Sequence, residues 1–397
     1  MEKNNRNTTG FVIGIDGTNL RQGGGITHLV ELLRAAEPQE YGIARVLVWS
    51  NASTLAALED RPWLVKLNPP DLDQGLLQRT LWQKFKLSNL ARVAGCDLLF
   101  VPGGSYAGSF KPIVTMSRNM LPFEMQELSR YGWSLKKLRL LLLRQSQSRS
   151  FHHADGVIFL TQYANNGVLA ITGPLPGLTL VIPHGLNDRF QMKPRAQREI
   201  AEYSVNHPYR LIYVSIVDQY KHQWHVVEAV AALRRAGLPV TLDLVGPSYA
   251  PSLERLNASL QQWDPQRTWV NYRDAIPYQE LHLKYAQADL GIFASSCENM
   301  PNILLETMAS GLPVACSNRG PMPEVLGDAG VYFDPEQPQE IERALRKLIE
   351  SPVLRSETAK ASYERSLQFT WERCATETFA FLAQTALQHK ASTCAAS

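Results

Sequence analysis

Two glutamates, Glu298 and Glu306, stand eight residues apart in the stretch SSCENMPNILLETMASGLPVACS (residues 295–317). Carboxylates placed in this way could accept hydrogen bonds from the hydroxyls of a bound sugar. The spacing alone carries little information, because the chain contains 23 glutamates and the same interval also separates Glu342 from Glu350. The residues around the pair must therefore decide whether it forms a site.

The residues around this pair predict a short helix that follows a buried strand. Pro301 suits the first turn of a helix, where its missing N–H would have no partner anyway. Gly311 followed by Pro313 is a typical helix end. The preceding stretch DLGIFAS has the apolar composition of a buried strand. The helix therefore begins at the carboxyl end of a strand, where open α/β sheets bind ligands.

The first turn of this helix could hold an anion between the two carboxylates. The backbone N–H groups of residues 302–304 would be available to a diphosphate, as at any helix N-terminus. Carboxylates would repel that anion unless hydroxyls lay between them, so a diphosphate with a sugar at each end fits. The alternative is an ordinary helix, with Glu298 favoured by the helix dipole and Glu306 partly exposed.

Alternating strands and helices would position this helix. The second half of the chain has strand patterns at 210–217, 239–246, 268–272, 289–295 and 312–317, and helix patterns at 222–237, 251–263, 277–288 and 302–310. The first half has strand patterns at 11–17, 44–49, 97–104, 111–117, 155–161 and 178–185, with a helix pattern at 26–36. Alternation at these lengths predicts parallel βαβ units, and therefore doubly wound sheets.

Composition excludes several classes of protein. A chain of 397 residues that is 45% apolar and 19% charged fits two globular domains. Its five cysteines are scattered without a CxxC pair, which indicates reduced thiols rather than disulfides or a zinc site. No apolar run reaches the roughly 18 residues of a spanning helix. The polar N-terminus lacks the apolar region of a secretory signal, so we expect a cytoplasmic protein.

The net charge of +3 hides two halves of opposite sign. Residues 1–200 contain 23 lysines and arginines against 15 acidic residues, whereas residues 201–397 contain 17 against 22. A basic first domain suits an anionic partner. Zinc-finger spacing, RRM-type aromatic motifs and a basic region followed by heptads are absent from the sequence, so we expect no nucleic-acid binding. A phosphorylated small molecule or a membrane surface fits better.

The long stretch at 295–341 carries a family resemblance. SSCENMPNILLETMASGLPVACSNRGPMPEVLGDAGVYFDPEQPQEI strongly resembles the glutamate-x7-glutamate region of retaining GT-B glycosyltransferases of carbohydrate-active family 4. Weaker matches in GGGITHLVELLRA, DLLFVPGG, VIFLTQYA, VIPHGLNDRF, YKHQWHVVEAVAALR and LVGPSY extend the resemblance over most of the chain. It implies an α/β chain of GT-B fold, with two Rossmann-like doubly wound domains facing across a cleft, and a retaining, metal-independent hexosyltransferase without a cofactor.

The resemblance implies roles for the residues that match the family motif. Glu298 corresponds to the residue that binds hydroxyls of the transferred sugar, and Glu306 to the residue that binds the nucleotide ribose. Lys221 corresponds to the lysine that neutralises the departing diphosphate, so Glu298 and Lys221 are the expected catalytic pair. The other donor-binding residues that it implies are Asn299, Met300, Pro301, Asn302, Ile303, Leu304, Gly246, Arg273, Gly24 and Gly25.

The chain departs from the family pattern at the phosphates. The family usually carries an arginine five residues before the lysine, and this chain has Ile216 there. A second positive charge must then come from elsewhere, for which Arg21 and Arg118 are candidates, or the helix N-terminus contributes more. Arg118, followed by Asn119, stands where the family often has a histidine. His184 matches a family turn near the cleft, and we expect it to be structural rather than catalytic.

Asp71 and Asp73 form a DxD sequence, which is the metal-binding motif of the other glycosyltransferase fold. They follow LNPP rather than a clear buried strand. The resembling family does not generally need a chelated metal. We therefore expect no metal site here.

The segment SLKKLRLLLLRQSQSRS (residues 134–150) predicts a leucine-rich basic helix. Such a helix could lie on an anionic membrane with its apolar face down. The alternative is a domain helix with a leucine core face and a solvated basic face. Its place in the basic half adds support to the membrane interpretation, and both interpretations stay open. The charged residues concerned are Lys136, Lys137, Arg139, Arg144 and Arg149.

These features predict a domain plan. We expect an acceptor-binding domain at 1–190, a linker at 191–208, a donor-binding domain at 209–370 and a C-terminal helix at 371–397 that crosses back to the first domain. The expected reaction moves a hexose, preferably mannose, from a GDP-, UDP- or dTDP-linked donor to a hydroxyl of a glycan or lipid-linked acceptor. A cytoplasmic chain, peripheral on the inner membrane face, would serve cell-surface polysaccharide or lipopolysaccharide synthesis.

Two other classes of function remain open. A nucleotide-sugar epimerase of GT-B fold would bind the same donor but would need no acceptor. A catalytically silent scaffold would keep the fold without the chemistry, and Ile216 and Arg118 are the features that favour it. Screening nucleotide sugars for binding, followed by a search for transfer, separates these classes from an active transferase.

Overall fold

The computed structural model describes residues 10–21 and 23–396. They form two compact units, one made of the described residues within 10–123, 138–185 and 370–396, the other of Glu124–Lys137 and Leu186–Phe369. Residues 1–9, on which the expectation of no secretory signal rests, lie outside the described residues, as does Gln22 in the Gly-rich loop.

The first unit is built on a seven-stranded parallel sheet of order β3-β2-β1-β4-β5-β6-β7. The chain starts in the interior of the sheet and extends it first to one edge and then to the other, which is the doubly wound pattern. The central strands are buried, as their continuous apolar sequences predict. The strands are β1 (Phe11–Asp16), β2 (Ile43–Trp49), β3 (Leu64–Leu67), β4 (Leu98–Val101), β5 (Ile113–Met116), β6 (Gly156–Phe159) and β7 (Leu178–Val181).

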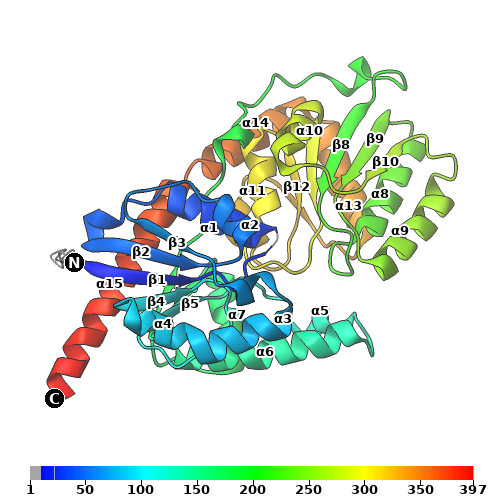
Figure 1. Ribbon diagram of the computed structural model, residues 1–397. Helices are drawn as coiled ribbons and strands as arrows, with labels where there is room; N and C mark the ends of the chain where they lie inside the picture. Colours follow the sequence, from blue (N-terminus) through cyan, green and yellow to red (C-terminus); the bar gives the residue numbers. More distant parts are fainter. Residues whose placement is uncertain (1–9, 22, 397) are drawn as a thin grey trace. The chain divides into compact units, whose positions relative to one another are not determined.

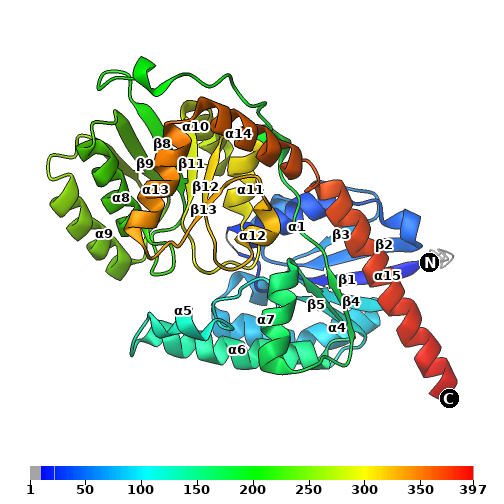
Figure 2. The ribbon, with the colours of Figure 1, turned by 180° about the vertical axis from the view of Figure 1, so that it is seen from behind.

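Helices cover both faces of this sheet. In both views α1 and the C-terminal helix α15 lie on one face, and α4, α6 and α7 lie on the other (Figures 1 and 2). The helices are α1 (Gly24–Arg34), α2 (Ala52–Ala56), α3 (Leu76–Trp82), α4 (Ser88–Val93), α6 (Leu135–His153), α7 (Gln162–Thr172) and α15 (Trp371–Ala396).

Contacts at points from Trp371 to Lys390 hold the helix α15 on the first unit. Near its start, Trp371 stacks on His184 with ring centroids 5.8 Å apart. Further along, the ring of Phe381 lies against Gly156, where a side chain on the glycine would collide with it. Near the C-terminal end, Lys390 forms an ion pair of 2.7 Å with Asp97.

The second unit contains a six-stranded parallel sheet of order β10-β9-β8-β11-β12-β13. The helix α8 packs with α9 and α13, and α11 packs with α14. The strands are β8 (Tyr209–Val214), β9 (Val240–Val245), β10 (Val270–Arg273), β11 (Leu290–Phe293), β12 (Val314–Ser317) and β13 (Val331–Phe333). The helices are α5 (Met125–Ser129), α8 (Gln223–Arg235), α9 (Ala250–Trp263), α10 (Leu281–Gln287), α11 (Asn302–Ala309), α12 (Met322–Leu326), α13 (Pro338–Ile349) and α14 (Pro352–Ser366).

The two units are not continuous in sequence. Residues 124–137, which the sequence plan puts in the first domain, pack with the second unit and contribute α5 and the start of α6 to it. Their attachment is largely polar, because Arg130 and Lys136 form salt bridges to the second unit, and Tyr131 packs beside Tyr249. Hydrophobic periodicity does not predict such contacts, which explains why the sequence plan missed them.

Candidate functional site

The two glutamates of the opening motif lie at the carboxyl end of β11 in the second unit. Glu298 stands in the loop between β11 and α11, and Glu306 lies inside α11. Lys221 comes from the neighbouring loop between β8 and α8, and β8 is paired with β11 in the sheet. The parallel topology therefore brings the three residues to one edge of the sheet, as the sequence predicts.

Lys221 and Glu298 form an ion pair, in which the ammonium group donates to Oε1 of the carboxylate. The lysine is 5% exposed. Its ammonium group also lies 5.0 Å from the ring centre of Tyr220 and 5.4 Å from that of Phe293, so aromatic faces share its charge. The two expected catalytic residues are therefore in direct contact, and each is the counter-ion of the other.

Glu306 is a buried carboxyl group with incomplete hydrogen bonding. Its side chain is 3% exposed, which differs from the partly exposed position of an ordinary surface helix. Oε1 accepts a hydrogen bond of 3.1 Å from the hydroxyl of Tyr278, and Oε2 has no partner among the described residues. Burial raises the pKa of Glu306 to about 8, although Tyr278 and the more distant cation of Arg189 oppose that shift.

The sequence did not predict two residues that lie near Glu306. Tyr278 supplies the hydroxyl group, and the guanidinium of Arg189 lies 5.2 Å from the centre of its ring. Arg189 comes from the segment that precedes β8, far from the motif in sequence. Neither residue carries a local signal, because only the packing of distant segments brings them to Glu306.

The N-terminus of α11 has one free backbone N–H group fewer than expected. The backbone N–H of Asn302 donates to the carbonyl of Met300 at 3.0 Å. This corrects the expectation that all three N–H groups of residues 302–304 would meet an anion, and leaves those of Ile303 and Leu304 in the first turn. No acidic residue stands in that turn. Asn299, Met300 and Pro301 lie in the buried approach to the helix.

Gly246 and Arg273 lie at the carboxyl ends of adjacent strands β9 and β10. The backbone N–H of Gly246 donates to the carbonyl of Arg273 at 3.0 Å, and its φ of 144° requires glycine. The side chain of Arg273 is exposed. Ile216 is 36% exposed and its carbonyl accepts a hydrogen bond of 2.9 Å from Gln223. The position of the family arginine therefore carries no charge.

Asp218 anchors the loop that carries Lys221. Its buried carboxylate accepts from the hydroxyl of Tyr131 at 2.9 Å and from the ammonium group of Lys136 at 2.8 Å. Its carbonyl accepts from the backbone N–H of Lys221 at 3.0 Å. The ammonium group of Lys136 also lies 3.9 Å from the ring centre of Tyr249. The segment 124–137 therefore holds the start of this loop.

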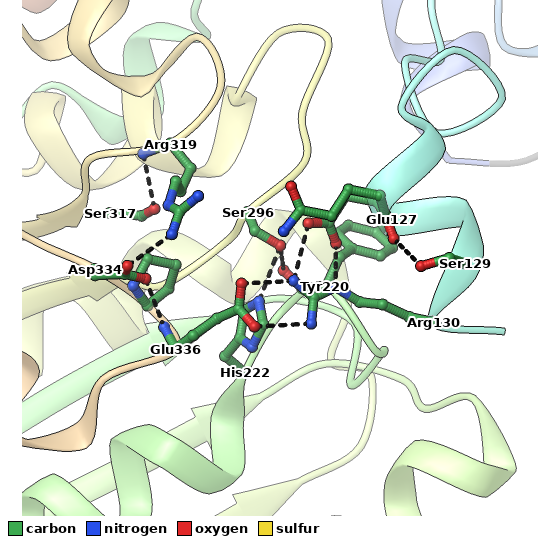
Figure 3. A network of polar contacts seen from close by, with 12 residues as sticks. Glu127, Ser129, Arg130, Tyr220, His222, Ser296, Ser317, Arg319, Asp334 and Glu336 are labelled. Atoms are coloured by element: carbon green, nitrogen blue, oxygen red, sulfur yellow. Dashed lines mark hydrogen bonds and ion pairs between the residues drawn. The ribbon is translucent and has the colours of Figure 1, made fainter. Parts of the chain in front are cut away.

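A second network joins the same segment to the end of the sheet (Figure 3). Arg130 donates to both carboxylate oxygens of Glu336, at 2.7 and 3.0 Å, and also to Glu127. Glu336 in turn is connected through its backbone N–H to Asp334, which binds Arg319 at 2.6 Å. These opposite charges stabilise one another within the second unit.

His222 links the loop of Lys221 to the loop of Glu298. Its Nε2 lies 2.9 Å from Oγ of Ser296, and the N–H of Ser296 donates to the carbonyl of Tyr220 at 2.9 Å (Figure 3). Burial lowers the pKa of His222 to about 2, so the ring stays neutral. The two catalytic candidates therefore stand on loops that are fixed to each other by uncharged hydrogen bonds.

In the first unit, the Gly-rich loop leads into α1. Gly24 and Gly25 are the first residues of that helix, and Gly23 before them has a φ of 62°. The guanidinium of Arg118 lies against this turn, because a Cβ on Gly25 would be 3.0 Å from Nη1. Burial lowers the pKa of Arg118 to about 10. The neighbouring Asn119 accepts a hydrogen bond of 3.1 Å from the N–H of Leu121.

His184 packs in an aromatic cluster of the first unit. Its ring centre lies 4.7 Å from that of His28 and it stacks on Trp371. His28 is completely buried, and burial, His184 and Arg118 hold its pKa well below the usual value. Arg21, in the same unit, donates to the carbonyl of Leu72.

The aspartates of the DxD sequence are used in other ways. Asp71 pairs with Lys86 at 3.0 Å, and Asp73 accepts from the N–H of Ala52 and from Asn68. Both lie in a single 3-10 turn, Pro70–Asp73, that follows the half-exposed edge strand β3. Within the described ranges, no group of three or more His, Cys, Asp or Glu side chains is placed to hold a metal.

The basic helix α6 is exposed at its start. Trp133, just before the helix, is completely exposed, and Leu135, Leu138 and Leu142 are 75%, 53% and 58% exposed. Lys136 differs from the expected solvated cation, because it binds Asp218. None of the described helices is both long enough and apolar enough to cross a membrane.

The sequence and the fold are similar to those of known glycosyltransferases. Residues 208–351 match the family described as Glycosyl transferases group 1. The O-antigen chain mannosyltransferase B of Escherichia coli is 33% identical over 110 residues, which cover 28% of this chain and 29% of that protein. The GDP-mannose-dependent alpha-(1-6)-phosphatidylinositol monomannoside mannosyltransferase of Mycolicibacterium smegmatis is 27% identical over 234 residues, which cover 56% of this chain and 59% of that protein. The matches thus span less than two thirds of these relatives.

Solved structures match almost the whole chain. Sucrose-phosphate synthase from Thermosynechococcus elongatus has a TM-score of 0.71 at 18% identity, covering 98% of this chain and 100% of that one. Anabaena Alr3699/HepE, solved in complex with UDP and glucose, has a TM-score of 0.66 at 17% identity, covering 94% and 100%. Residues 208–351 therefore form a domain of the family described as Glycosyl transferases group 1, and the chain as a whole has the GT-B fold.

Proposed function

We propose that this protein transfers a hexose from a nucleotide diphosphosugar to an acceptor hydroxyl, with retention of anomeric configuration. The observation that carries the proposal is the edge formed by Lys221, Glu298 and Glu306 at the start of α11. A buried carboxyl, a charge pair and a helix N-terminus together match the three parts of a nucleotide sugar. These parts are the ribose, the sugar hydroxyls and the diphosphate.

Glu306 would bind the ribose of the nucleotide. Its unpartnered Oε2 is a buried polar atom, and a ribose presents two adjacent hydroxyls that can each donate or accept a hydrogen bond. A polar atom left without a partner in a buried position is costly, so a ligand hydroxyl that supplies the partner binds favourably. Tyr278 would hold the other oxygen and fix the orientation of the carboxyl group.

When the donor binds, the ion pair between Lys221 and Glu298 would open, and each residue would bind a different part of the donor. Hydroxyls of the transferred sugar would donate to Glu298, and the ammonium group of Lys221 would turn its charge to the diphosphate. The bond between the anomeric carbon and the phosphate oxygen breaks, and the acceptor oxygen forms its bond on the same face. The departing diphosphate gains negative charge and takes the acceptor proton. A fixed cation beside it stabilises the transition state more than the ground state.

Mannose is the first sugar to test. Two of the relatives reported above are named mannosyltransferases, one of them GDP-mannose-dependent. GDP-mannose is therefore the preferred donor, with UDP- and dTDP-linked sugars as the alternatives. A glycan or lipid-linked acceptor in cell-surface polysaccharide synthesis is the matching proposal for the other substrate.

Calorimetric binding tests the proposal. GDP, UDP and dTDP are titrated into the wild-type protein, and into Glu306→Ala, Glu298→Ala and the control Glu364→Ala, whose side chain is 61% exposed on α14. We expect Glu306→Ala to weaken nucleotide binding, Glu298→Ala to slow sugar transfer with little change in nucleotide binding, and the control to behave as wild type. Binding of no nucleotide would reject the proposal. Sugar inversion or hydrolysis without any acceptor would favour an epimerase.

We also propose that α6 contacts an anionic membrane. The exposed leucines at its start and the fully exposed Trp133 are accompanied by Lys137 and Arg139, a combination that suits the membrane interface. Reversing the charges of Lys137 and Arg139 together should reduce binding to vesicles that contain phosphatidylglycerol. Lys136 is left unchanged because it binds Asp218. Unaltered binding to these vesicles would show that the helix is structural only.

A further inference from the structure

A cavity of about 560 Å³ lies in the first unit, between the loop 106–111 and the end of α6. Its volume is in the range of pockets that bind small molecules. Ile113, which begins β5, and His153, which ends α6 just ahead of β6, both line it, so it lies near the amino ends of these strands. The Gly-rich loop follows the carboxyl end of β1 in the same parallel sheet. The cavity is therefore at the opposite edge of the sheet from that loop.

Serine hydroxyls on two helices hold the loop that forms one wall of the cavity. Oγ of Ser88, on α4, accepts from the backbone N–H groups of Ser109 and Phe110 at 2.8 and 3.1 Å. Oγ of Ser150, on α6, accepts from the N–H of Tyr106 at 2.8 Å. The hydroxyl of Tyr106 accepts from the N–H of Phe110 at 2.9 Å. The polar groups of the loop are thus bonded within the protein, and the wall is formed before any ligand arrives.

The wall of the cavity is mainly apolar. The side chains of Phe110 and Ile113 form its buried part, at 4% and 1% exposed. Tyr106 and Ala107 complete it. Apolar atoms of a ligand that cover this wall leave water, which favours the binding of a hydrocarbon segment.

Three basic side chains stand around this apolar wall, those of Lys111, Arg149 and His153. None of the described residues that line the cavity is acidic. Arg149 forms no ion pair with any residue that the structure describes. Lys111 lies 3.6 Å from Asp155, a carboxylate that is not part of the lining. The charge around the cavity is therefore positive, and an anion is the complementary ligand.

The cations of the cavity lie on the face of α6 that exposes its leucines. Leu138 and Leu142, one turn apart, are 53% and 58% exposed. Arg149 follows Leu138 by eleven residues and His153 follows it by fifteen, which is about three and four turns of an α-helix. Both basic side chains are exposed. The surface that we propose to contact the membrane therefore continues along one face of the helix to the cavity.

An anionic phospholipid fits both parts of this cavity. We propose that Lys111 and Arg149 bind the phosphate group of a membrane lipid, and that the first carbons of its acyl chain lie against Phe110 and Ile113. The planar guanidinium of Arg149 can donate two parallel hydrogen bonds to phosphate oxygens. The inference rests on the proposed membrane contact of α6 and specifies the lipid that α6 meets. Because the cavity is at the opposite edge from the Gly-rich loop, this lipid anchors the protein rather than accepting the sugar.

Binding of a soluble lipid tests the cavity apart from the membrane. Dihexanoyl phosphatidylglycerol, below its micelle concentration, is titrated into the full chain by calorimetry. Dihexanoyl phosphatidylcholine tests the same tail with a head of no net charge, and glycerol phosphate tests the head alone. Sedimentation with vesicles of phosphatidylglycerol and phosphatidylcholine then tests the membrane itself.

Four variants are compared with the wild type. Arg149→Met removes a cation of the cavity, and Arg149→Lys keeps the charge without the planar fork. The control Arg45→Met removes an exposed arginine on β2 that does not line the cavity. The double variant Lys137→Glu/Arg139→Glu reverses charges of α6 that also lie outside the lining.

We expect the wild type to bind dihexanoyl phosphatidylglycerol at least about tenfold more tightly than either partial probe. Arg149→Met should weaken this binding about fivefold to tenfold, because a cation beside the phosphate is lost. Arg149→Lys should lie between Arg149→Met and the wild type, and Arg45→Met should bind as wild type. The double variant should bind the soluble lipid as wild type but the vesicles more weakly.

Three outcomes would overturn the inference. Equal binding of the two dihexanoyl lipids would show an apolar cavity that does not select for charge. Unchanged binding of the anionic lipid by Arg149→Met would show that its phosphate is bound elsewhere. Weaker binding by the double variant but not by Arg149→Met would place the lipid on the helix face outside the cavity.

The cavity and the membrane contact can fail separately. Arg149-dependent binding of dihexanoyl phosphatidylglycerol by a protein that binds no vesicles would support the cavity site while rejecting the membrane contact. These measurements use no nucleotide, so the proposed sugar transfer is tested independently of them.

Discussion

The charged residues at the two candidate sites differ in how they are satisfied. In the second unit, Lys221 pairs with Glu298, Lys136 with Asp218, and Arg130 with two carboxylates. In the first unit, Arg118 has no carboxylate partner within the described residues, and a single backbone carbonyl is the acceptor for each of Arg21 and Arg79. The first set of charges is paired with carboxylates in direct contact, whereas no carboxylate is in direct contact with the second set within the described residues.

This difference shows two ways of preparing a binding site. Paired charges keep a loop in place before the ligand arrives, and the ligand must then compete with an existing partner. Unpaired charges destabilise the fold until an anion neutralises them, so the ligand adds stability when it binds. Substitutions should therefore have opposite effects in the two units, and four of them test this, from the largest expected effect to the smallest.

Replacing Lys221 should have the largest effect. Lys221→Met removes the cation that faces the departing diphosphate, and the rate of nucleoside diphosphate release from a nucleotide sugar should fall about 100- to 1,000-fold. The change also leaves Glu298 without its partner. The double variant Lys221→Met/Glu298→Gln should regain stability in thermal unfolding without regaining the rate. Lys360→Met, 74% exposed on α14, is the control. A normal rate in Lys221→Met would remove this lysine from the mechanism.

Glu306 should make the stability of the fold depend on pH. Burial raises its pKa from 4.5 to about 8, so the folded protein holds a proton that the unfolded chain releases. Stability from this group is complete below pH 4.5 and is lost as pH rises towards 8, by about 1.4 kcal/mol per pH unit. The free energy of unfolding of Glu306→Gln should lack this slope, which amounts to about 3 kcal/mol between pH 4.5 and 7.

Denaturant unfolding at several pH values checks this expectation. The control is Glu364→Gln, because that side chain is 61% exposed and its contribution should be small. Parallel pH profiles for wild type and Glu306→Gln would show that Glu306 is ionised in the folded protein. In that case both carboxylate oxygens would be acceptors, and Oε2 could bind only a group that donates a hydrogen bond.

Arg130 tests the paired charges of the second unit. Arg130→Met leaves Glu127 and Glu336 close together without their shared cation, so the free energy of unfolding should fall by about 2 kcal/mol. The matched control is Arg346→Met, because Arg346 also bridges two glutamates but does so on the helix surface. Its loss should cost only about 0.5 kcal/mol. Equal losses in the two variants would show that the network of Figure 3 adds no more than a surface pair.

Much of the fold could be predicted from the sequence. Long apolar runs such as LIYV at 211–214 and LGIF at 290–293 form buried strands because no other element can hide both of their faces. The short strand β3 was missed because its residues are only half buried and show no clean alternation. The strand β13 has three residues, too few for a period to be visible.

Only those residues of the candidate site that lie within a short, recognisable stretch of the sequence were predictable. The motif around Glu298 and Glu306 predicted the sheet edge and the helix start, and Lys221 came from the separate match of its own stretch to the family. Tyr278 and Arg189 were missed because they reach Glu306 only after distant segments pack. The engagement of Lys136 with Asp218 was missed for the same reason, since 82 residues separate the two.

Replacing Arg118 should change the free energy of unfolding least, but in the opposite direction from replacing Arg130. Its guanidinium is partly buried without a carboxylate, and burial already lowers its pKa to about 10. Replacing an uncompensated buried charge by an apolar side chain of similar length should stabilise the fold. Arg118→Met should therefore raise the free energy of unfolding by about 1 kcal/mol in the absence of ligands, as measured by denaturant unfolding.

The sign of this change decides between the two kinds of site. Arg130→Met and Arg118→Met remove the same charge and add the same side chain. The difference between their effects on the free energy of unfolding therefore comes from the groups that surround each arginine. A loss of stability in both would mean that Arg118 has a structural role like that of Arg130. A gain in Arg118→Met that disappears when wild type is saturated with inorganic pyrophosphate would show that a phosphate anion supplies the missing partner, because ligand binding stabilises only the protein that keeps the arginine.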